Sequence, residues 1–331
     1  MIEASTLSAL RGWASRNLFV LFMAMTVLLG FVAPGPGAAE GMFSLKSLAQ
    51  IGVAVIFFLH GANLAPSVFL SGVRRWRVHL LVQGTTYIVF PIAAIILALV
   101  LGGVMGPDLL LGFFFLAALP STVSSAVALT AVAGGNVPVA VFNASLSGLI
   151  GLLLTPALIA PVSATGSGTF DFWAAVIDIA FTVLLPFAVG QAARPLIGGF
   201  LTRRKSLLGR VDRGVILLII YTSFAASTAA GIWSNFSAQE VISTFVLSAI
   251  MLAGALAFVN GAAALWRLPP PDKAAGVFCG ATKSLATGAP MAQILFADHP
   301  AVGGIMLPLL VYHPLQLMVC AALAQCYADR V

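Results

Sequence analysis

The stretch Phe278-Cys-Gly-Ala-Thr-Lys-Ser-Leu285 places a lysine between two hydroxyl-bearing residues, inside an apolar run at about 274–297. A second polar stretch, Pro120-Ser-Thr-Val-Ser-Ser125, interrupts another apolar run at about 109–132. Glycine and proline in such runs free backbone amide and carbonyl groups that lipid cannot satisfy. Each stretch therefore predicts a helix that is broken where it lines a cavity or meets another helix.

The composition indicates which solvent surrounds these runs. Hydrophobic residues make up 60% of the 331-residue chain and charged residues only 8%, whereas about a quarter of the residues in a globular protein are charged. So few charges cannot form a water-facing shell, and we expect an integral membrane protein. The net charge of +6 does not indicate a nucleic-acid partner, because the basic residues lie in short loops between apolar runs.

Ten apolar runs approach the roughly 20 residues that a helix needs to cross a bilayer. They cover about 17–33, 47–64, 78–103, 109–132, 137–160, 172–193, 214–232, 240–265, 274–297 and 301–326. If the N-terminus is cytoplasmic, the inside segments hold fourteen of the sixteen Lys and Arg residues, and the outside segments hold only Lys46. Basic residues accumulate on the cytoplasmic side. We therefore expect an all-α polytopic protein of the cell (inner) membrane, with ten helices and both termini in the cytoplasm.

The ten runs divide into two sets of five, at about 17–160 and 172–326. Five helices per half invert the second half relative to the first, which is typical of secondary transporters. The two polar stretches fall in the fourth run of each half, and each is followed by a run with a central proline, Pro156 or Pro314. The prediction is one membrane domain over residues 1–331, with a transport site where broken helices 4 and 9 meet.

Lys283 is the sixteenth basic residue and lies inside the ninth run. A lysine at the bilayer centre costs about 2.5–3.5 kcal/mol on insertion scales. We therefore expect it to face a cavity, a counter-charge or the carbonyl groups at a helix end, rather than to extend to the membrane surface. Such an ammonium would attract an anionic group, or stand where a cation otherwise binds.

Neutral oxygens gather near the first break, at Ser124, Ser125 and Asn143, and Gln83 adds an amide in the third run. Hydroxyl and amide oxygens suit sodium, although small polar residues also simply let helices approach closely. His60 and His313 are interpreted either as proton carriers or as hydrogen-bonded packing residues. The residues predicted to contact the substrate are Lys283, Ser284, Asn143, His313 and Gln316.

Several segments resemble the bile acid:sodium symporter family, and its symporter-like branch most closely. The likeness is carried by Leu119-Pro-Ser-Thr-Val-Ser-Ser125, Phe142-Asn-Ala-Ser145, Leu154-Thr-Pro156, Gly190-Gln191, Leu218-Ile-Ile-Tyr-Thr222, Phe278-Cys-Gly-Ala-Thr-Lys-Ser-Leu285, Pro290-Met291 and Pro308-Leu-Leu-Val-Tyr-His-Pro314. The resemblance implies a core domain and a panel domain, with broken helices 4 and 9 crossing near two sodium sites. By position it assigns Ser124, Ser125 and Asn143 to the first site, and Gln83 and Thr282 to the second.

One departure from the family concerns the second site. The bile-acid branch carries an acidic residue in broken helix 9, whereas Phe278–Ala281 contains none and Lys283 follows closely. A fixed ammonium a few ångströms away repels sodium, so the lysine is expected either to weaken this site or to replace the ion.

These observations predict a secondary active transporter that carries an organic anion, a bile-acid-like or other amphipathic carboxylate or sulfate, by alternating access with sodium as the coupling ion. The alternatives are a sodium-independent or proton-coupled carrier of the same fold, or a regulatory membrane protein without turnover. An enzyme is not expected, because adjacent helical residues such as Lys283 and Ser284 do not face each other. Apart from sodium, no cofactor is predicted.

Overall fold

The computed structural model describes residues 18–41, 44–63, 74–103, 105–163, 177, 180–297 and 299–328, and every regular element within them is helical. The elements, in chain order, are α2 (Leu18–Val32), α3 (Pro34–Ala38), α4 (Leu45–Asn63), α6 (Trp76–Gly84), η1 (Thr85–Val89), α7 (Phe90–Leu101), α8 (Pro107–Ala118), α9 (Ser124–Val132), α10 (Val137–Ser163), η2 (Ala180–Leu184), α12 (Leu185–Arg203), α13 (Lys205–Ala229), η3 (Ile232–Asn235), α14 (Ala238–Leu265), α15 (Pro270–Ala281), α16 (Leu285–Leu295) and α17 (Val302–Ala328).

Six helices in the described part are long and apolar enough to cross a membrane: Leu45–Asn63, Trp76–Leu101, Val137–Val162, Phe181–Leu201, Ala238–Leu265 and Val302–Ala328. Large apolar side chains lie exposed on these helices, including Leu99 at 81% and Leu196 at 87%. Such an outer surface suits lipid better than water. The other predicted runs coincide with α2, with α13 and with the interrupted pairs α8/α9 and α15/α16.

The sixth and seventh predicted runs are misplaced at their ends. Residues 172–193 were expected to form a span, but α12 continues to Arg203, and α13 begins at Lys205 rather than at residue 214. Seven charged residues lie between positions 194 and 213, and they limit the two predicted apolar runs. They mark the end of the apolar core, whereas a helix continues into the polar headgroup layer, where charged side chains are hydrated.

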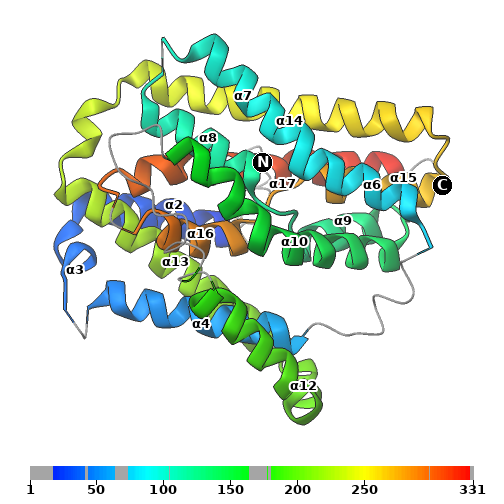
Figure 1. Cartoon of the computed structure of the whole chain (residues 1–331), viewed down its shortest axis with the longest axis horizontal. Helices are drawn as coiled ribbons and strands as arrows, with labels where there is room; N and C mark the ends of the chain where they lie inside the picture. The colour runs from blue at the N-terminus through cyan, green and yellow to red at the C-terminus, as the bar shows by residue number, and fades with distance from the viewer. Residues whose placement is uncertain are drawn as a thin grey trace, which may run out of the picture.

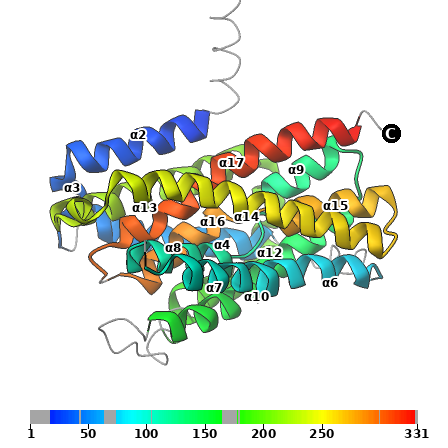
Figure 2. The same cartoon turned by 90° about the horizontal axis from the view of Figure 1, so that it is seen from above.

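Helices α4 and α12 pack against each other and form a pair at the lower side of Figure 1. Two glycines allow this close packing: a Cβ at Gly61 would overlap the carbonyl oxygen of Phe187, and a Cβ at Gly190 would overlap that of Phe58. Small residues of this kind let membrane helices approach at backbone distance. On the other side of the molecule, α14 packs against α6, α15 and α17, as Figure 2 shows from above.

Both predicted breaks are present. Helix α8 ends at Ala118 and α9 begins at Ser124, while α15 ends at Ala281 and α16 begins at Leu285. Leu119 is extended, with φ −70° and ψ 150°, because the ring of the following proline disfavours the helical conformation. At the second break, Thr282 is also extended, with φ −100° and ψ 146°, and the side chain of Ser284 accepts a hydrogen bond from the amide of Thr287 to start α16.

Candidate functional site

The two breaks contact each other directly. The amide of Ser284 donates to the carbonyl oxygen of Pro120 at 2.9 Å, and the hydroxyls of Ser121 and Thr282 lie 3.4 Å apart. Backbone groups freed by each interruption are thus satisfied by the other, which is what a lipid-surrounded break requires.

Lys283 fills the space beside this crossing and is fully buried. Its ammonium donates to the carbonyl oxygens of Ala117 and Leu119 at 2.7 Å each and to that of Thr86 at 3.0 Å. It also lies 4.1 Å from the centre of the Phe90 ring, where the aromatic face attracts a cation. The sequence predicted that this lysine faces a cavity, a counter-charge or the carbonyl groups at a helix end, and the structure shows the last of these three. Among the described residues, no carboxylate forms an ion pair with it.

The three carbonyl groups are available for identifiable reasons. Ala117 and Leu119 lie at the C-terminal end of α8, where helix carbonyls lack intrahelical partners and carry partial negative charge. Thr86 belongs to the π-helical turn η1, in which the amide of Phe90 bonds to the carbonyl of Thr85 five residues back. The next amide in that register would belong to Pro91, which has no N–H group. The carbonyl of Thr86 is therefore left for the lysine.

Other side chains complete the ends of the broken helices. Thr155 donates to the carbonyl of Ala118, and Tyr312 donates to that of Ala281, both at 2.8 Å. Both residues lie in motifs that carry the family resemblance, beside or near the central prolines of their runs, but neither was predicted to be a site residue. Buried hydroxyls beside such prolines were the available signal.

Gln316 holds the backbone of Lys283 on both sides. The side-chain oxygen of Gln316 accepts from the Lys283 amide at 2.7 Å, and its nitrogen donates to the Lys283 carbonyl at 2.8 Å. Nδ1 of His313 lies 3.1 Å from the side-chain nitrogen of Gln316. These contacts place both residues against the second break.

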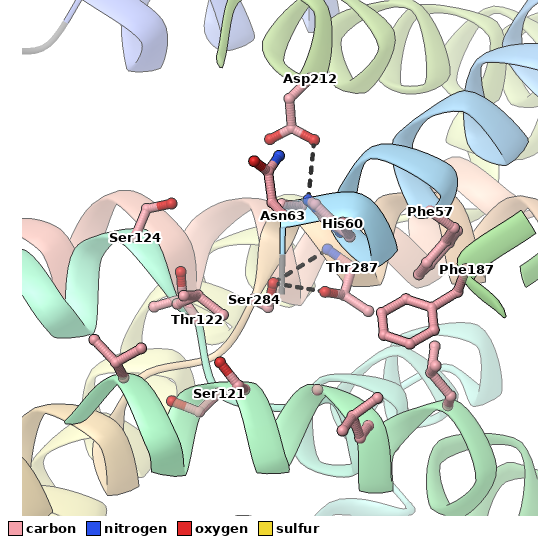
Figure 3. Close-up of a pocket in the computed structure, with 17 residues that line it drawn as sticks. Phe57, His60, Asn63, Ser121, Thr122, Ser124, Phe187, Asp212, Ser284 and Thr287 are labelled. Atoms are coloured by element: carbon pink, nitrogen blue, oxygen red, sulfur yellow. Dashed lines mark hydrogen bonds and ion pairs between the residues drawn. The ribbon is translucent and has the colours of Figure 1, made fainter. Parts of the chain in front are cut away.

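A cavity of about 370 Å³ opens next to the crossing, between the breaks and the α4/α12 pair (Figure 3). Its walls come from α4, α10, α12, α13 and α16 and from the first break. The polar part of the lining consists of His60, Asn63, Ser121, Thr122, Ser124, Ser145, Asp212, Ser284 and Thr287. The apolar part includes Phe57, Leu149, Leu152 and Phe187.

The start of α9 and the start of α16 both contribute to this lining, through Ser124 and Ser284. Val123, which precedes α9, makes no side-chain cap, so the first amides of that helix are left without a capping side chain. Helix N-termini carry partial positive charge and bind anions. This side of the cavity therefore favours a negatively charged group.

Asp212 and His60 lie beside each other in another part of the cavity wall, with 3.6 Å between an oxygen of the carboxylate and Nε2 of the ring (Figure 3). They come from α13 and α4. His60 was singled out from the sequence as a proton carrier or packing residue. Asp212 was not predicted to be a site residue, because it precedes the predicted run at 214–232 and lies among charged residues that are typical of a loop.

Among the predicted site residues, the structure brings Ser124 and Ser284 into the cavity lining, whereas Lys283, Gln316, His313, Thr282 and Ser125 are not part of it. Ser125 donates to the hydroxyl of Thr122 at 3.2 Å. The cavity lining is therefore distinct from a buried frame around the crossing, which consists of Lys283, Gln316, His313 and Thr282.

Asn143 and Gln83 form a separate group beside α6 and α10. Gln83 donates to the Asn143 carbonyl at 3.1 Å, and the Asn143 side-chain oxygen lies 3.1 Å from His79 Nδ1. The side-chain oxygen of Gln83 is buried and has no hydrogen-bond partner among the described residues. The resemblance assigned these two residues to different sodium sites, but the structure places them in contact.

Comparison with known proteins gives a consistent result. The model of the SBF-like CPA transporter family matches residues 17–329. An uncharacterized protein of Pseudomonas aeruginosa is 41% identical over 312 residues, 94% of this chain and 93% of the relative. The provisionally named symporter YfeH of Escherichia coli (strain K12) is 37% identical over 310 residues, 93% of this chain and 92% of the relative.

A eukaryotic relative is also similar over nearly the whole chain. The sodium/bile acid cotransporter 7 of Mus musculus is 31% identical over 314 residues, 94% of this chain and 92% of the relative. The apolar helices and the match from residue 17 to residue 329 agree with a multi-pass membrane transporter. The chain therefore belongs to the SBF-like CPA transporter family.

Proposed function

We propose that the chain is a secondary active transporter that moves a small organic anion across the cell membrane by alternating access, in symport with sodium. The observation that carries the proposal is the cavity of about 370 Å³ beside two crossing broken helices. In this proposal the ten apolar segments form two inverted repeats of five, and both termini lie in the cytoplasm.

The anionic part of the substrate binds at the starts of α9 and α16, near Ser124 and Ser284. The ammonium of Lys283, which is buried against the first break, adds to the positive potential at these helix starts. The apolar part of the substrate packs against Phe57 and Phe187 on the α4/α12 pair, both of which line the cavity. An amphipathic carboxylate or sulfate matches this division.

The proposal of alternating access is supported by the elements that form the walls of the cavity. One wall belongs to the α4/α12 pair, which its glycine contacts hold together as a panel, and the other belongs to the core formed by the breaks and α10. Rocking of the panel against the core opens such a site to one side of the membrane at a time.

Sodium coupling is supported by the printed name of the murine relative and by the unpartnered, buried oxygen of Gln83 beside Asn143. A second candidate, a sodium-independent carrier of the same fold, is favoured by Lys283. Its ammonium already occupies a cradle of three carbonyl oxygens at 2.7–3.0 Å, where a monovalent cation would otherwise bind.

Purified protein in proteoliposomes tests these proposals, with taurocholate and a panel of smaller carboxylates and sulfates as probes. The symporter predicts anion counterflow and uptake that depend on a sodium gradient, with potassium at equal ionic strength as the control. Uptake that persists without sodium identifies the second candidate. Binding without counterflow would contradict transport and indicate a regulatory membrane protein.

A further inference from the structure

The start of α6 and the end of α14 lie at the right-hand end of Figure 1. Four arginines at these helix ends form a basic pocket. Arg74, Arg75, Arg77 and Arg267 line a cavity of about 370 Å³. Arg77 and Arg267 also line a neighbouring cavity of about 500 Å³, together with Trp76, Trp266 and Leu265. The transport proposal makes no use of this pocket.

The pocket carries an excess of positive charge. Asp272 is the carboxylate that lines it within the described part of the chain, and this side chain is 3% exposed and already engaged. One carboxylate oxygen accepts from Asn136 at 2.7 Å, and the other lies 3.4 Å from Arg75. Arg74, Arg77 and Arg267 therefore present guanidinium groups whose charge Asp272 does not balance.

The backbone of Arg267 adds an independent observation. Arg267 has a positive φ of 51°, in the left-handed region where glycine is the usual residue after a helix. The amide of Arg267 bonds to the carbonyl of Ala264, and the amide of Leu268 bonds to that of Ala263, which is the helix-ending pattern that glycine serves best. The turn does not need a guanidinium, and it adopts a conformation that disfavours any side chain. The side chain of Arg267 lines both cavities.

Two indoles and an apolar edge indicate that the ligand has acyl chains. Trp76 is 58% exposed and Trp266 is 37% exposed, and tryptophan prefers the headgroup layer of a membrane. Leu265 is 79% exposed beside them. A soluble phosphate would use the arginines alone, whereas a phospholipid would use the arginines, the indoles and Leu265 together.

We propose that this basic pocket binds the phosphate of an anionic phospholipid at the predicted cytoplasmic surface of the membrane. The guanidinium groups contact the phosphate, and the chains lie along α14 past Leu265. Arg77 stacks over Trp76, with 5.6 Å between its guanidinium carbon and the ring centre, and this contact holds both groups at the rim. The bound lipid would contact both the start of α6 and the end of α14.

The test is thermal melting of the purified protein with added phosphatidylglycerol, phosphatidylcholine of the same chains, or glycerol 3-phosphate. Phosphatidylglycerol is expected to raise the melting temperature in a saturable way, and the other two are not. Arg267→Gly is expected to weaken the apparent affinity for phosphatidylglycerol about fivefold, because one arginine near a membrane surface contributes on this scale. Arg77→Gln should act similarly.

Arg267→Gly also separates binding from folding. Glycine relieves the left-handed backbone, so the lipid-free melting temperature should stay equal or rise while the lipid effect falls. Arg210→Gln is the matched control, since Arg210 is exposed and lies outside the pocket. An equal loss of lipid effect in Arg210→Gln would overturn the proposal in favour of diffuse attraction. Stabilisation by glycerol 3-phosphate equal to that by the lipid would overturn it in favour of a soluble phosphate site.

Discussion

The ammonium of Lys283 lies 2.7 Å from the carbonyl oxygen of Leu119. A side chain from the second break thus satisfies a backbone carbonyl of the first. A second bond in the same direction runs from the amide of Ser284 to the carbonyl oxygen of Pro120 at 2.9 Å. The two halves of the chain are thus joined at a point where each alone would leave polar backbone groups in an apolar interior. This relationship makes Lys283 part of the frame that holds the two breaks together.

Lys283→Ala is expected to lower the melting temperature of the protein. It leaves three buried carbonyls without a donor, and each such group costs about 1–3 kcal/mol. Because alanine also leaves a space, methylammonium added to the buffer should partly restore the melting temperature, while the bulkier choline should not. Thermal melting of the two proteins in matched salt solutions measures this.

The control for that substitution is Lys46→Ala, at a partly exposed lysine paired with Glu40. It should melt near the wild-type temperature and gain nothing from methylammonium. A Lys283→Ala protein as stable as the wild type would show that water, or a rearranged backbone, satisfies the carbonyls as well as the lysine does.

Gln83→Leu is expected to abolish stabilisation by sodium if the proposed symport is correct. The substitution removes the buried side-chain oxygen that lacks a partner and retains a similar volume. Thermal melting across a sodium titration, with potassium keeping the ionic strength constant, gives the measurement. Gln50→Leu is the control, because Gln50 is exposed on α4. Sodium stabilisation that is unchanged in Gln83→Leu would remove this residue from the coupling site.

The position of the first break was predictable from the sequence, because Pro120 disfavours the helical conformation at Leu119. The second break was predicted from the polar stretch around Lys283, which contains no proline. The burial of Lys283 was also predictable from the cost of exposing it to lipid. Its partners were not, because every residue has a backbone carbonyl, and the residue types at Ala117 and Thr86 do not indicate which carbonyls the fold leaves free. The carbonyl of Thr86 is left for Lys283 by the π-helical turn η1, which ends at Val89, and by Pro91, which has no N–H group.

Asp212 shows a second limit of the sequence. A carboxylate just before an apolar run is typical of a solvated loop, and nothing local distinguishes one that contacts His60 in a cavity wall. Helix α13 begins at Lys205, and this longer helix carries Asp212 to the cavity wall. Charged residues at helix ends therefore mark the edge of the hydrocarbon layer and not the edge of the structure.

Asp212→Asn is expected to tighten binding of an anionic substrate. A unit charge roughly 8 Å from the bound anion contributes about 2 kcal/mol at an effective dielectric constant near 20, and salt screening reduces this. We expect about three- to tenfold higher affinity, measured by substrate titration of the melting temperature. His60→Gln should act in the opposite direction, because it leaves the carboxylate without its partner.

Asp108→Asn is the matched control for this prediction. Asp108 also faces a histidine, His299, at 3.8 Å, but neither residue lines the transport cavity. Its substitution should leave substrate affinity unchanged. Equal effects of the two substitutions would mean that total charge, and not the cavity wall, determines anion affinity.

Gly61→Ala is expected to destabilise the protein and to weaken substrate binding together. The added methyl group would overlap the carbonyl of Phe187, so α4 and α12 would have to separate, and overpacking of this kind costs about 1–3 kcal/mol. The separation would also displace Phe57 and Phe187, which belong to the apolar part of the cavity wall. Thermal melting with and without substrate measures both effects.

Gly199→Ala provides the comparison, because Gly199 lies on α12 with no atom close to the position of the added methyl group. It should behave as the wild type or slightly better, since alanine favours a helix over glycine. If Gly61→Ala instead lowered stability while substrate affinity stayed unchanged, the α4/α12 contact would be purely structural. The cavity wall would then keep its shape without the close approach of these two helices, and the proposal that they move as one panel would lose its support.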